Sequence, residues 1–450
     1  MKKLFPCFLI CASFMRITSL HADITGLIDP VNILQQAPLG GDFYGMRSAA
    51  AEHGVGLTVQ SVSDMLGNVS GGMSKGGAYA GLVDIGVIAD LGKAVGWEGG
   101  TFKSTWLWLY GNDLSSRNVG SATTVSGIYG APAFRCYELW LQQNTLHDAL
   151  SLRAGLLGLD AEFGLSETAA LFVNSTFGIP AGVTMNLPNG GPTYPEATPG
   201  VRLAVQPASW LKLRSAIAQG NPFQQKQNRY GFNWNFGPSA GLLSMNEAEA
   251  SWCKDDSPKG LPGTAKADFW IQTGSGVPAQ VEFGSPTVAS YSSGFYGIID
   301  QMIFRAPDAK FSMDSSSGKN PSSGKEAPGN QGAVKGLSAF ARAGFSPQSW
   351  SPCSFYTDGG LVYTGLLPGR DADKLGLAFA YAGMGSLCSS QTAANGCPGC
   401  GYEAVTELSY SIRLAPAIAI QPDLQYIIHP CGTQQYGNAL VVGVRAVIDF

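Results

Sequence analysis

The chain ends on the segment Leu440-Val441-Val442-Gly443-Val444-Arg445-Ala446-Val447-Ile448-Asp449-Phe450. Counted back from Phe450, the even-numbered positions form one apolar face, whereas Asp449 and Arg445 lie on the other. A repeat of two residues predicts a β-strand. One wholly apolar face opposite a charged face is typical of a barrel wall between lipid and water. The alternative is the edge strand of a soluble sandwich, whose apolar face a second layer would cover.

The composition favours the barrel. Charged residues make up 13% of the 450 residues, about half of the usual ~25% in soluble proteins. Mean hydropathy is only +0.06, and no later stretch is apolar for the ~18 residues that a spanning helix needs. Apolar residues spread over alternating strands give this combination. The formal net charge of -4 gives no reason to expect nucleic acid as a partner.

Residues 1–22 are predicted to form a secretory signal peptide. Lys2 and Lys3 give the basic start, Leu4 to Met15 the apolar core, and Ala22 a cleavage site. An exported chain without a helical anchor is periplasmic, secreted or a barrel of the outer membrane.

Residues 23–53 are predicted to be a periplasmic lead that ends in a short helix over 43–53. Asp42 is the expected N-cap of this helix, and Gly54 is its expected stop.

Residues 54–450 are predicted to form one all-β domain, a transmembrane antiparallel β-barrel of about 16 strands. Alternating segments bounded by turn residues lie near 54–64, 79–90, 101–111, 133–143, 150–160, 199–206, 210–219, 242–252, 265–273, 294–305, 335–345, 355–366, 373–384, 403–414, 417–428 and 439–450.

The connections between these strands alternate between long and short, as an outer-membrane barrel requires. Segments such as 65–78 and 161–198 follow odd strands and are expected outside the cell, whereas short turns follow even strands. Segment 306–334 is the exception, because it is long and follows the tenth strand. Either it is a periplasmic insert or the strand count slips there.

The chain resembles the carbohydrate-selective porins of the OprB type over nearly all of its mature length. Eight segments in the same order carry the resemblance: Gly40–Arg47, Leu66–Gly72, Tyr137–Gln143, Ala170–Gly178, Leu187–Pro192, Ala197–Arg202, Gly365–Asp371 and Gln421–Ile428. The resemblance implies a 16-stranded barrel in the bacterial outer membrane through which sugars diffuse.

Parity along each strand assigns side chains to the channel wherever the opposite face is apolar. The predicted channel-lining residues are Asp84, Glu138, Trp140, Arg153, Arg202, Arg214, Glu247, Glu249, Arg342, Glu407, Arg413, Gln425 and Arg445. Alternating arginines and carboxylates would offer donors and acceptors to sugar hydroxyls while their net charge nearly cancels. Ordinary hydrated lumen residues would give the same pattern. Asp300 and Gln301 cannot be oriented, because both faces of their strand are mixed.

Two further features bear on the channel. Trp106, Trp108 and Trp140 could stack on sugar rings if they face the lumen. Loop 161–198 is the longest and is expected to fold inward and narrow the channel, although a lid packed outside would fit equally well. Its candidate constriction residues are Asn174, Asn189, Thr193, Tyr194 and Glu196.

Seven cysteines remain after the signal peptide, an odd number that is high for such a barrel. Cys353, Cys388, Cys397, Cys400 and Cys431 are predicted to lie in extracellular loops, as disulfides within the chain or to other envelope proteins. The Cys397-Pro398-Gly399-Cys400 spacing suits redox or zinc chemistry, but neither a βαβ unit nor enough further ligands accompanies it. We therefore expect no metal and no cofactor.

No enzyme is predicted. Gly237-Pro238-Ser239-Ala240-Gly241 matches a nucleophile elbow by letters alone and lacks the strand and helix that the motif needs. The sequence favours an outer-membrane porin for neutral mono- and disaccharides. A general porin and a cysteine-cross-linked surface protein are the alternatives. The expected partners are permeant sugars, outer-membrane lipid and the assembly machinery that recognises Phe450.

Overall fold

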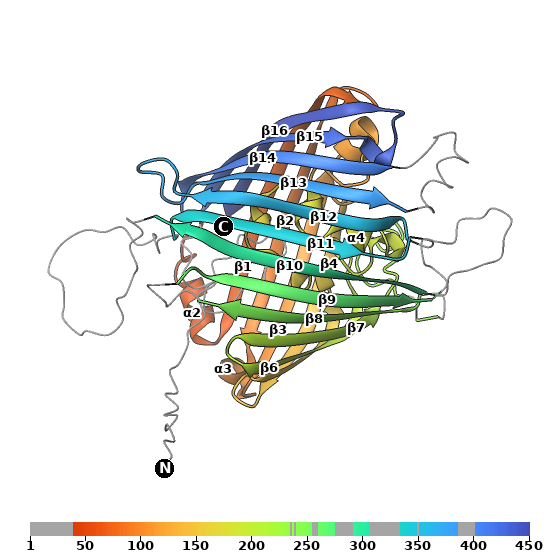
Figure 1. Cartoon of the computed structure of the whole chain (residues 1–450). Helices are drawn as coiled ribbons and strands as arrows, with labels where there is room; N and C mark the ends of the chain where they lie inside the picture. The colour runs from red at the N-terminus through yellow and green to blue at the C-terminus, as the bar shows by residue number, and fades with distance from the viewer. Residues whose placement is uncertain are drawn as a thin grey trace, which may run out of the picture.

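The protein is a closed antiparallel β-barrel in which every strand pairs with its neighbours in the sequence and β16 pairs with β1. The computed structural model describes residues 39–234, 236–237, 240–253, 260–274, 291–306, 334–348, 351–385 and 401–450. The predicted signal peptide and residues 23–38 lie outside these ranges. Figure 1 shows the strands running side by side around a single barrel.

All sixteen predicted strands are present. They are β1 (Val55–Gly72), β2 (Gly76–Asp90), β3 (Gly100–Gly111), β4 (Ala133–Thr145), β5 (Leu150–Leu157), β6 (Thr198–Ala208), β7 (Leu211–Gln219), β8 (Leu242–Trp252), β9 (Gly263–Thr273), β10 (Tyr291–Arg305), β11 (Gly336–Phe345), β12 (Cys353–Thr364), β13 (Lys374–Met384), β14 (Tyr402–Ala415), β15 (Ile418–Ile428) and β16 (Gly437–Asp449).

Alternation along each strand separates the two faces of the wall. On β4, Leu139 and Leu141 are 37% and 45% exposed on the outside, whereas Glu138 and Trp140 are buried inside. The apolar outer face suits lipid, and the polar inner face keeps charged side chains away from it. The period of the apolar residues therefore indicates where the strands lie and which of their faces meets the lipid.

The first predicted loop, 65–78, is wrong. β1 continues to Gly72 and β2 begins at Gly76, which leaves a connection of residues 73–75. The glycine-rich stretch looks like a loop, but it pairs with β16 on one side and with β2 on the other. Gly71 and Gly72 adopt φ values of 67° and 63°, a conformation that glycine tolerates best, at the bulged end of the strand.

The helix before the barrel, α2 (Met46–Glu52), is confirmed but starts later than predicted. Its N-cap is Gly45 rather than Asp42, although the Asp42 carboxylate still accepts the Ser48 N–H at 2.8 Å. Gly54 follows the helix with a φ of 77°. We call the end of the barrel that carries α2 and Phe450 the terminal end (Figure 1).

The N-terminal segment docks on the last strand at this end. The Leu39 N–H donates to the Asp449 carbonyl at 2.9 Å, and the Arg47 guanidinium donates to the Phe450 backbone oxygen. The Phe450 N–H donates to the Val59 carbonyl at 2.8 Å. The first described residues and the C-terminal residue therefore meet at the seam where the barrel closes.

The strand count does not slip at the long segment after β10. β10 and β11 pair in antiparallel register, and the Ala306 N–H donates to the Lys335 carbonyl at 3.0 Å across the base of the segment. Residues 307–333 themselves lie outside the described ranges.

The remaining helices of the described residues are short. They are α3 (Leu91–Val95), η1 (Ser115–Val119), η2 (Leu159–Ala161), η3 (Ala169–Leu171), η4 (Ser175–Phe177), α4 (Ala181–Thr184), η5 (Pro188–Gly190) and η6 (Pro430–Gly432). Within the described residues, no helix has the length and apolarity to cross a membrane. Most of them lie on the two connections that enter the barrel.

Candidate functional site

The connection between β5 and β6, residues 158–197, folds into the barrel; we call it the inner loop. Its apolar residues pack against the inner face of the wall, with Phe172 and Phe177 against Phe340 of β11. Gly182 of α4 lies so close to β12 that a Cβ there would come within 2.7 Å of Tyr356 Cβ. The expected inward fold of loop 161–198 is therefore found, and a lid packed outside is excluded.

The connection between β3 and β4, residues 112–132, also turns inward. Val125 and Ile128 are fully buried, and the Ser126 hydroxyl donates to Asp64 of β1 at 2.7 Å. The Tyr194 hydroxyl of the inner loop donates to the Ile128 carbonyl at 2.6 Å. The two connections thus support each other inside the barrel.

One side of the barrel, β10–β16 with β1, holds the inner loop; we call it the anchor wall. Arg342 of β11 makes an ion pair with Asp358 of β12, and both side chains are fully buried. The same guanidinium donates to three inner-loop carbonyls, including that of Thr176 at 3.0 Å. A single arginine therefore joins two strands to the loop.

Further anchors come from β10, β14 and β15. Asp300 accepts the Thr168 N–H at 2.9 Å, and Glu407 accepts the Asn174 N–H at 2.9 Å. Gln425 binds both connections, because it accepts from the Asn174 side chain at 3.0 Å and donates to the Val125 carbonyl at 2.9 Å. These groups satisfy loop backbone that would otherwise be buried without partners.

A cavity of about 850 Å³ remains beside the inner loop. Its wall is mainly β3–β9, which we call the channel wall, with Lys374 of β13 on the opposite side. Charged side chains of both signs face it from the wall and from the loop: Lys103, Arg153, Arg202, Lys212, Arg214, Lys266, Lys374, Asp148, Asp160, Glu162, Glu167, Glu196 and Glu249.

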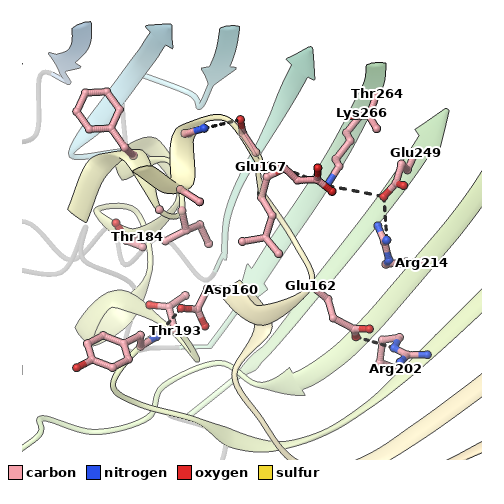
Figure 2. A pocket seen from close by; sticks show the side chains of 18 of the residues that line it. Asp160, Glu162, Glu167, Thr184, Thr193, Arg202, Arg214, Glu249, Thr264 and Lys266 are labelled. Carbon is pink, nitrogen blue, oxygen red and sulfur yellow. Dashed lines mark hydrogen bonds and ion pairs between the residues drawn. The ribbon is translucent and has the colours of Figure 1, made fainter. Parts of the chain in front are cut away.

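Two arginines and a loop carboxylate form the first cluster on this wall. Arg202 Nε lies 2.7 Å and Arg153 Nη1 lies 3.5 Å from the same oxygen of Glu162. Figure 2 shows Glu162 reaching from the loop to Arg202. Burial raises the pKa of Glu162, but the charges of Arg153 and Arg202 outweigh it and hold the pKa at about 2. This carboxylate is therefore ionised at any physiological pH.

A second cluster continues along the wall. Arg214 of β7 contacts Glu247 and Glu249 of β8, each at 2.8 Å. Lys266 of β9 lies 3.7 Å from Glu249, as Figure 2 shows. Glu247 turns away from the cavity and accepts the Gly164 N–H of the inner loop at 3.1 Å.

Trp140 belongs to the cavity wall, but its ring is already occupied. The Arg153 guanidinium lies 3.8 Å from the ring centroid, and the side chain is 4% exposed. Its neighbour Glu138 pairs with Lys103 at 2.7 Å and accepts from the indole N–H. Trp140 therefore orients Arg153 by cation–π contact and has little free surface for a sugar.

The other two tryptophans face outward. Trp108 is 54% exposed on the outer face, and Trp106 stacks on Phe134 with ring centroids 5.5 Å apart. Neither residue lines the cavity. The condition for stacking on sugars, that these rings face the lumen, is therefore not met for Trp106 and Trp108.

The structure divides the predicted channel-lining residues into groups. Trp140, Arg153, Arg202, Arg214 and Glu249 line the cavity. Asp84, Glu138 and Glu247 lie on the inner face of the same side without lining it. Arg342, Glu407, Gln425 and Arg445 are buried on the anchor wall.

Two predicted channel-lining residues of the anchor wall, Arg445 and Arg413, do not line the cavity. Arg445 pairs with Asp64 across the closing seam at 2.7 Å and does not face open space. Arg413 is exposed near the end of β14, where its guanidinium donates to the Pro416 carbonyl at 3.0 Å. Its place at the end of the strand, which parity does not reveal, separates Arg413 from the cavity.

The sequence analysis missed the partners that make these groups into a site. Glu162 and Asp160 lie in the inner loop, and parity says nothing about a loop. Asp64 and Asp358 lie on strands, on the polar face, and parity would have found them. Asp300, which the sequence left unoriented, points inward to the loop, whereas Gln301 accepts from the Trp252 indole.

The five candidate constriction residues of the inner loop all border the cavity. Glu196 is held by Arg135 and Asn228, and Asn174 is held by Gln425. Asp160, next to Glu162, accepts from the Tyr137 hydroxyl at 2.7 Å and from the Tyr194 N–H at 2.9 Å. Burial raises the pKa of Asp160 to about 6 against these hydrogen bonds. The inner loop is thus held by residues of the channel wall and by residues of the anchor wall.

The cysteines that were predicted to lie in extracellular loops do not all do so. Cys353 begins β12 and is buried, with its thiol 3.4 Å from the Phe355 carbonyl and in no disulfide. Its predicted place in an extracellular loop is therefore wrong, because the strand starts two residues earlier than its apolar pattern indicates. Cys431 lies in η6, whereas Cys388, Cys397 and Cys400 lie outside the described residues. No group of metal-ligating side chains occurs in the described part of the chain.

Comparison with known proteins gives consistent results. The model of the family described as "Carbohydrate-selective porin, OprB family" matches residues 74–450. Porin B of Pseudomonas aeruginosa is 23% identical over 438 residues, which cover 90% of this chain and 89% of the relative. A putative porin, QuiX, of Acinetobacter baylyi is 23% identical over 437 residues, or 91% of this chain and 92% of the relative.

The fold matches a solved structure. The structure of Pseudomonas putida OprB at high pH superposes with a TM-score of 0.76 at 21% sequence identity, covering 92% of this chain and 99% of that chain. A barrel of sixteen strands, an apolar outer face and a family match over most of the length agree with one another. The chain belongs to the carbohydrate-selective porin family, OprB, of the bacterial outer membrane.

Proposed function

We propose that this outer-membrane porin lets neutral mono- and disaccharides diffuse along the channel wall, past the cavity beside the inner loop. The observation that carries the proposal is the pairing of charges there. Arg202 and Arg153 share Glu162, and Arg214 shares Glu247 and Glu249. No chemical step is assigned to the protein, since diffusion needs none.

Paired charges suit an uncharged polyol. Guanidinium groups donate and carboxylates accept, so sugar hydroxyls find both kinds of partner along one wall. An inorganic ion gains less at these clusters, because Arg153, Arg202 and Arg214 already have carboxylates beside them. The inner loop supports selection by size, since it fills the barrel beside the anchor wall and leaves about 850 Å³ of cavity.

The orientation and partners follow from the same fold. The terminal end would face the periplasm, and the long connections after odd strands would face outward. Outer-membrane lipid would cover the apolar face. Phe450, the exposed last residue beside the seam, would be recognised by the assembly machinery before closure.

Disulfide-linked envelope proteins remain as proposed partners of Cys388, Cys397 and Cys400. Gel electrophoresis of isolated outer membranes with and without thiol tests this part. High-mass species that collapse with thiol support cross-linking, and an unchanged mobility contradicts it.

Liposome swelling with the purified, refolded porin tests the main proposal. Glucose, a disaccharide, an amino acid of similar size to glucose and potassium chloride would be compared. We expect glucose to enter faster than the amino acid, together with a low single-channel conductance. Entry ranked by size alone would indicate a general porin, the alternative function, and no swelling would contradict both.

A further inference from the structure

The cavity contains a pair of like charges that directly oppose each other. Arg153 of β5 and Arg202 of β6 are register partners on neighbouring antiparallel strands, and both are buried. Like charges at such positions destabilise a sheet unless a counter-charge lies between them. The structure therefore has to supply an anion at this point of the wall.

Glu162 supplies this negative charge, and Glu162 lies in the inner loop rather than on the wall. One of its carboxylate oxygens contacts both guanidinium groups. Gln142 of β4 adds a neutral bridge, because its side-chain oxygen accepts from Arg153 and from Arg202 at 2.8 Å and 2.7 Å. Between the two arginines there is thus one negative charge and one neutral acceptor.

Several other cations of the channel wall have carboxylates on their own sheet, whereas Arg135 of β4 pairs with Glu196 of the inner loop. Lys103 pairs with Glu138 of β4, and Arg214 pairs with two glutamates of β8. Lys266 lies near Glu249. Within the described residues, Arg153 and Arg202 make their ion pairs with a loop carboxylate alone.

The backbone that carries Glu162 is held independently of its side chain. Asp160, two residues earlier, is fixed by Tyr137 and Tyr194. Gly164, two residues later, donates to Glu247. Removing the charge of Glu162 should therefore leave the loop in place and expose two uncompensated guanidinium groups to the cavity.

We infer that Glu162 is the residue that sets the charge preference of the channel, by occupying the Arg153–Arg202 pair as a built-in carboxylate. When that charge is removed, the pair becomes a binding site for carboxylate-bearing sugars such as hexuronates, and for small inorganic anions. This inference rests on the proposed sugar channel and names the residue that lowers the positive charge of its wall. A bidentate guanidinium site is the geometry that carboxylates prefer.

The test is the reversal potential of single channels in a potassium chloride gradient across a planar bilayer. In Glu162→Gln we expect the chloride-to-potassium permeability ratio to rise by about tenfold, since an unpaired charge in a narrow polar cavity is weakly screened. Glucuronate, added as the probe, should block this variant and should block the wild type less.

Asp148→Asn is the matched control. It removes the same charge from an exposed residue at the mouth of the same cavity, and its φ of 66° is one that asparagine accepts. Solvent screens this position, so its permeability ratio should stay near that of the wild type. An equal shift in both variants would mean that total charge, not the arginine pair, decides, and would overturn the inference.

Two further variants separate the local site from a general disturbance. Glu162→Asp keeps the charge and should keep the wild-type preference. Glu162→Gln combined with Arg202→Gln restores the balance and should bring the ratio back towards the wild type. If the double variant remains as anion-preferring as Glu162→Gln, the arginine pair is not the site. Retained β-structure by circular dichroism shows that each variant has folded.

The inference and the proposed function fail in different ways. If wild-type liposomes admit no glucose, the sugar channel is wrong, whatever the ion preference. If glucose enters the wild type but Glu162→Gln keeps the wild-type ion ratio and ignores glucuronate, the sugar channel stands and the role of Glu162 is wrong.

Discussion

The anchor wall and the channel wall have the same alternation of polar and apolar residues, but their inward charged side chains have different roles. Both carry arginines and carboxylates on an inward face opposite apolar residues. On the anchor wall, pairs such as Arg342–Asp358 and Arg445–Asp64 are buried under the inward connections. On the channel wall, Arg202, Arg214 and Lys266 border open space. Where the inner loop lies decides whether a lumen charge is a structural anchor or part of a channel.

The position of these charges determines which properties a substitution should change. A buried ion pair contributes little net stability compared with an apolar pair of the same shape, but breaking it by removing one partner is costly. The channel-wall pairs are nearly as buried, but their charges border the cavity. Variants on the anchor wall should therefore change stability and pore size, whereas variants on the channel wall should change selectivity as well as stability.

The largest effect is expected for Arg342→Met. It leaves Asp358 unpaired and removes the donor to three inner-loop carbonyls. Breaking such a pair typically costs about 3–5 kcal/mol. We expect that loss in urea unfolding of the reconstituted barrel, with a larger single-channel conductance as the loop leaves the wall. An unchanged conductance would show that Arg342 does not hold the loop.

Acid should weaken the tie between the inner loop and the channel wall. The pKa of Glu162 lies at about 2, below its ordinary value of 4.5. A depressed carboxyl pKa stabilises the folded state fully above pH 4.5 and loses that contribution as pH falls towards 2. The shift corresponds to on the order of 3 kcal/mol. Urea unfolding should show this loss between those pH values, and Glu162→Gln should lack it. A loss of the same size in the variant would assign the effect to other carboxyls.

A smaller cost is expected for Gln425→Ala, which removes one group that serves both inward connections. The Asn174 side chain loses an acceptor, and the Val125 carbonyl loses its donor. An unsatisfied buried polar group costs about 1–3 kcal/mol. Urea unfolding gives the stability, and open-channel noise reports whether the loop moves. Stability equal to that of the wild type would mean that water replaces the amide.

The smallest effect is expected for Arg413→Gln, because this exposed arginine belongs to neither wall's buried network. Surface substitutions of this kind usually stay within about 0.5 kcal/mol. The urea midpoint and the reversal potential should both match the wild type. A shift in ion preference as large as that of Glu162→Gln would place Arg413 in the permeation path after all.

The sequence could predict most of the fold and part of the site. All sixteen strands and most of their faces followed from the period of apolar residues, whereas the inward fold of the loop was one of two possibilities that the sequence left open. The predicted strand bounds were wrong where pairing with a neighbouring strand outweighed a local composition typical of loops. Gly67 forms strand because it pairs with β16 and with β2, Gly72 pairs with β16, and Cys353 pairs with Met384 of β13.

What the sequence alone determined is which way most strand residues face, since a side-chain period of two is a local property. The tertiary structure decided which inward residues meet. Arg342 and Arg202 have the same local signature, yet one lies beneath the inner loop and the other beside open space. Glu162 becomes the counter-ion of Arg153 and Arg202 because the inner loop places it against β5 and β6. Contacts between residues far apart in the chain depend on how the barrel closes and how the loop packs, and no local period encodes either.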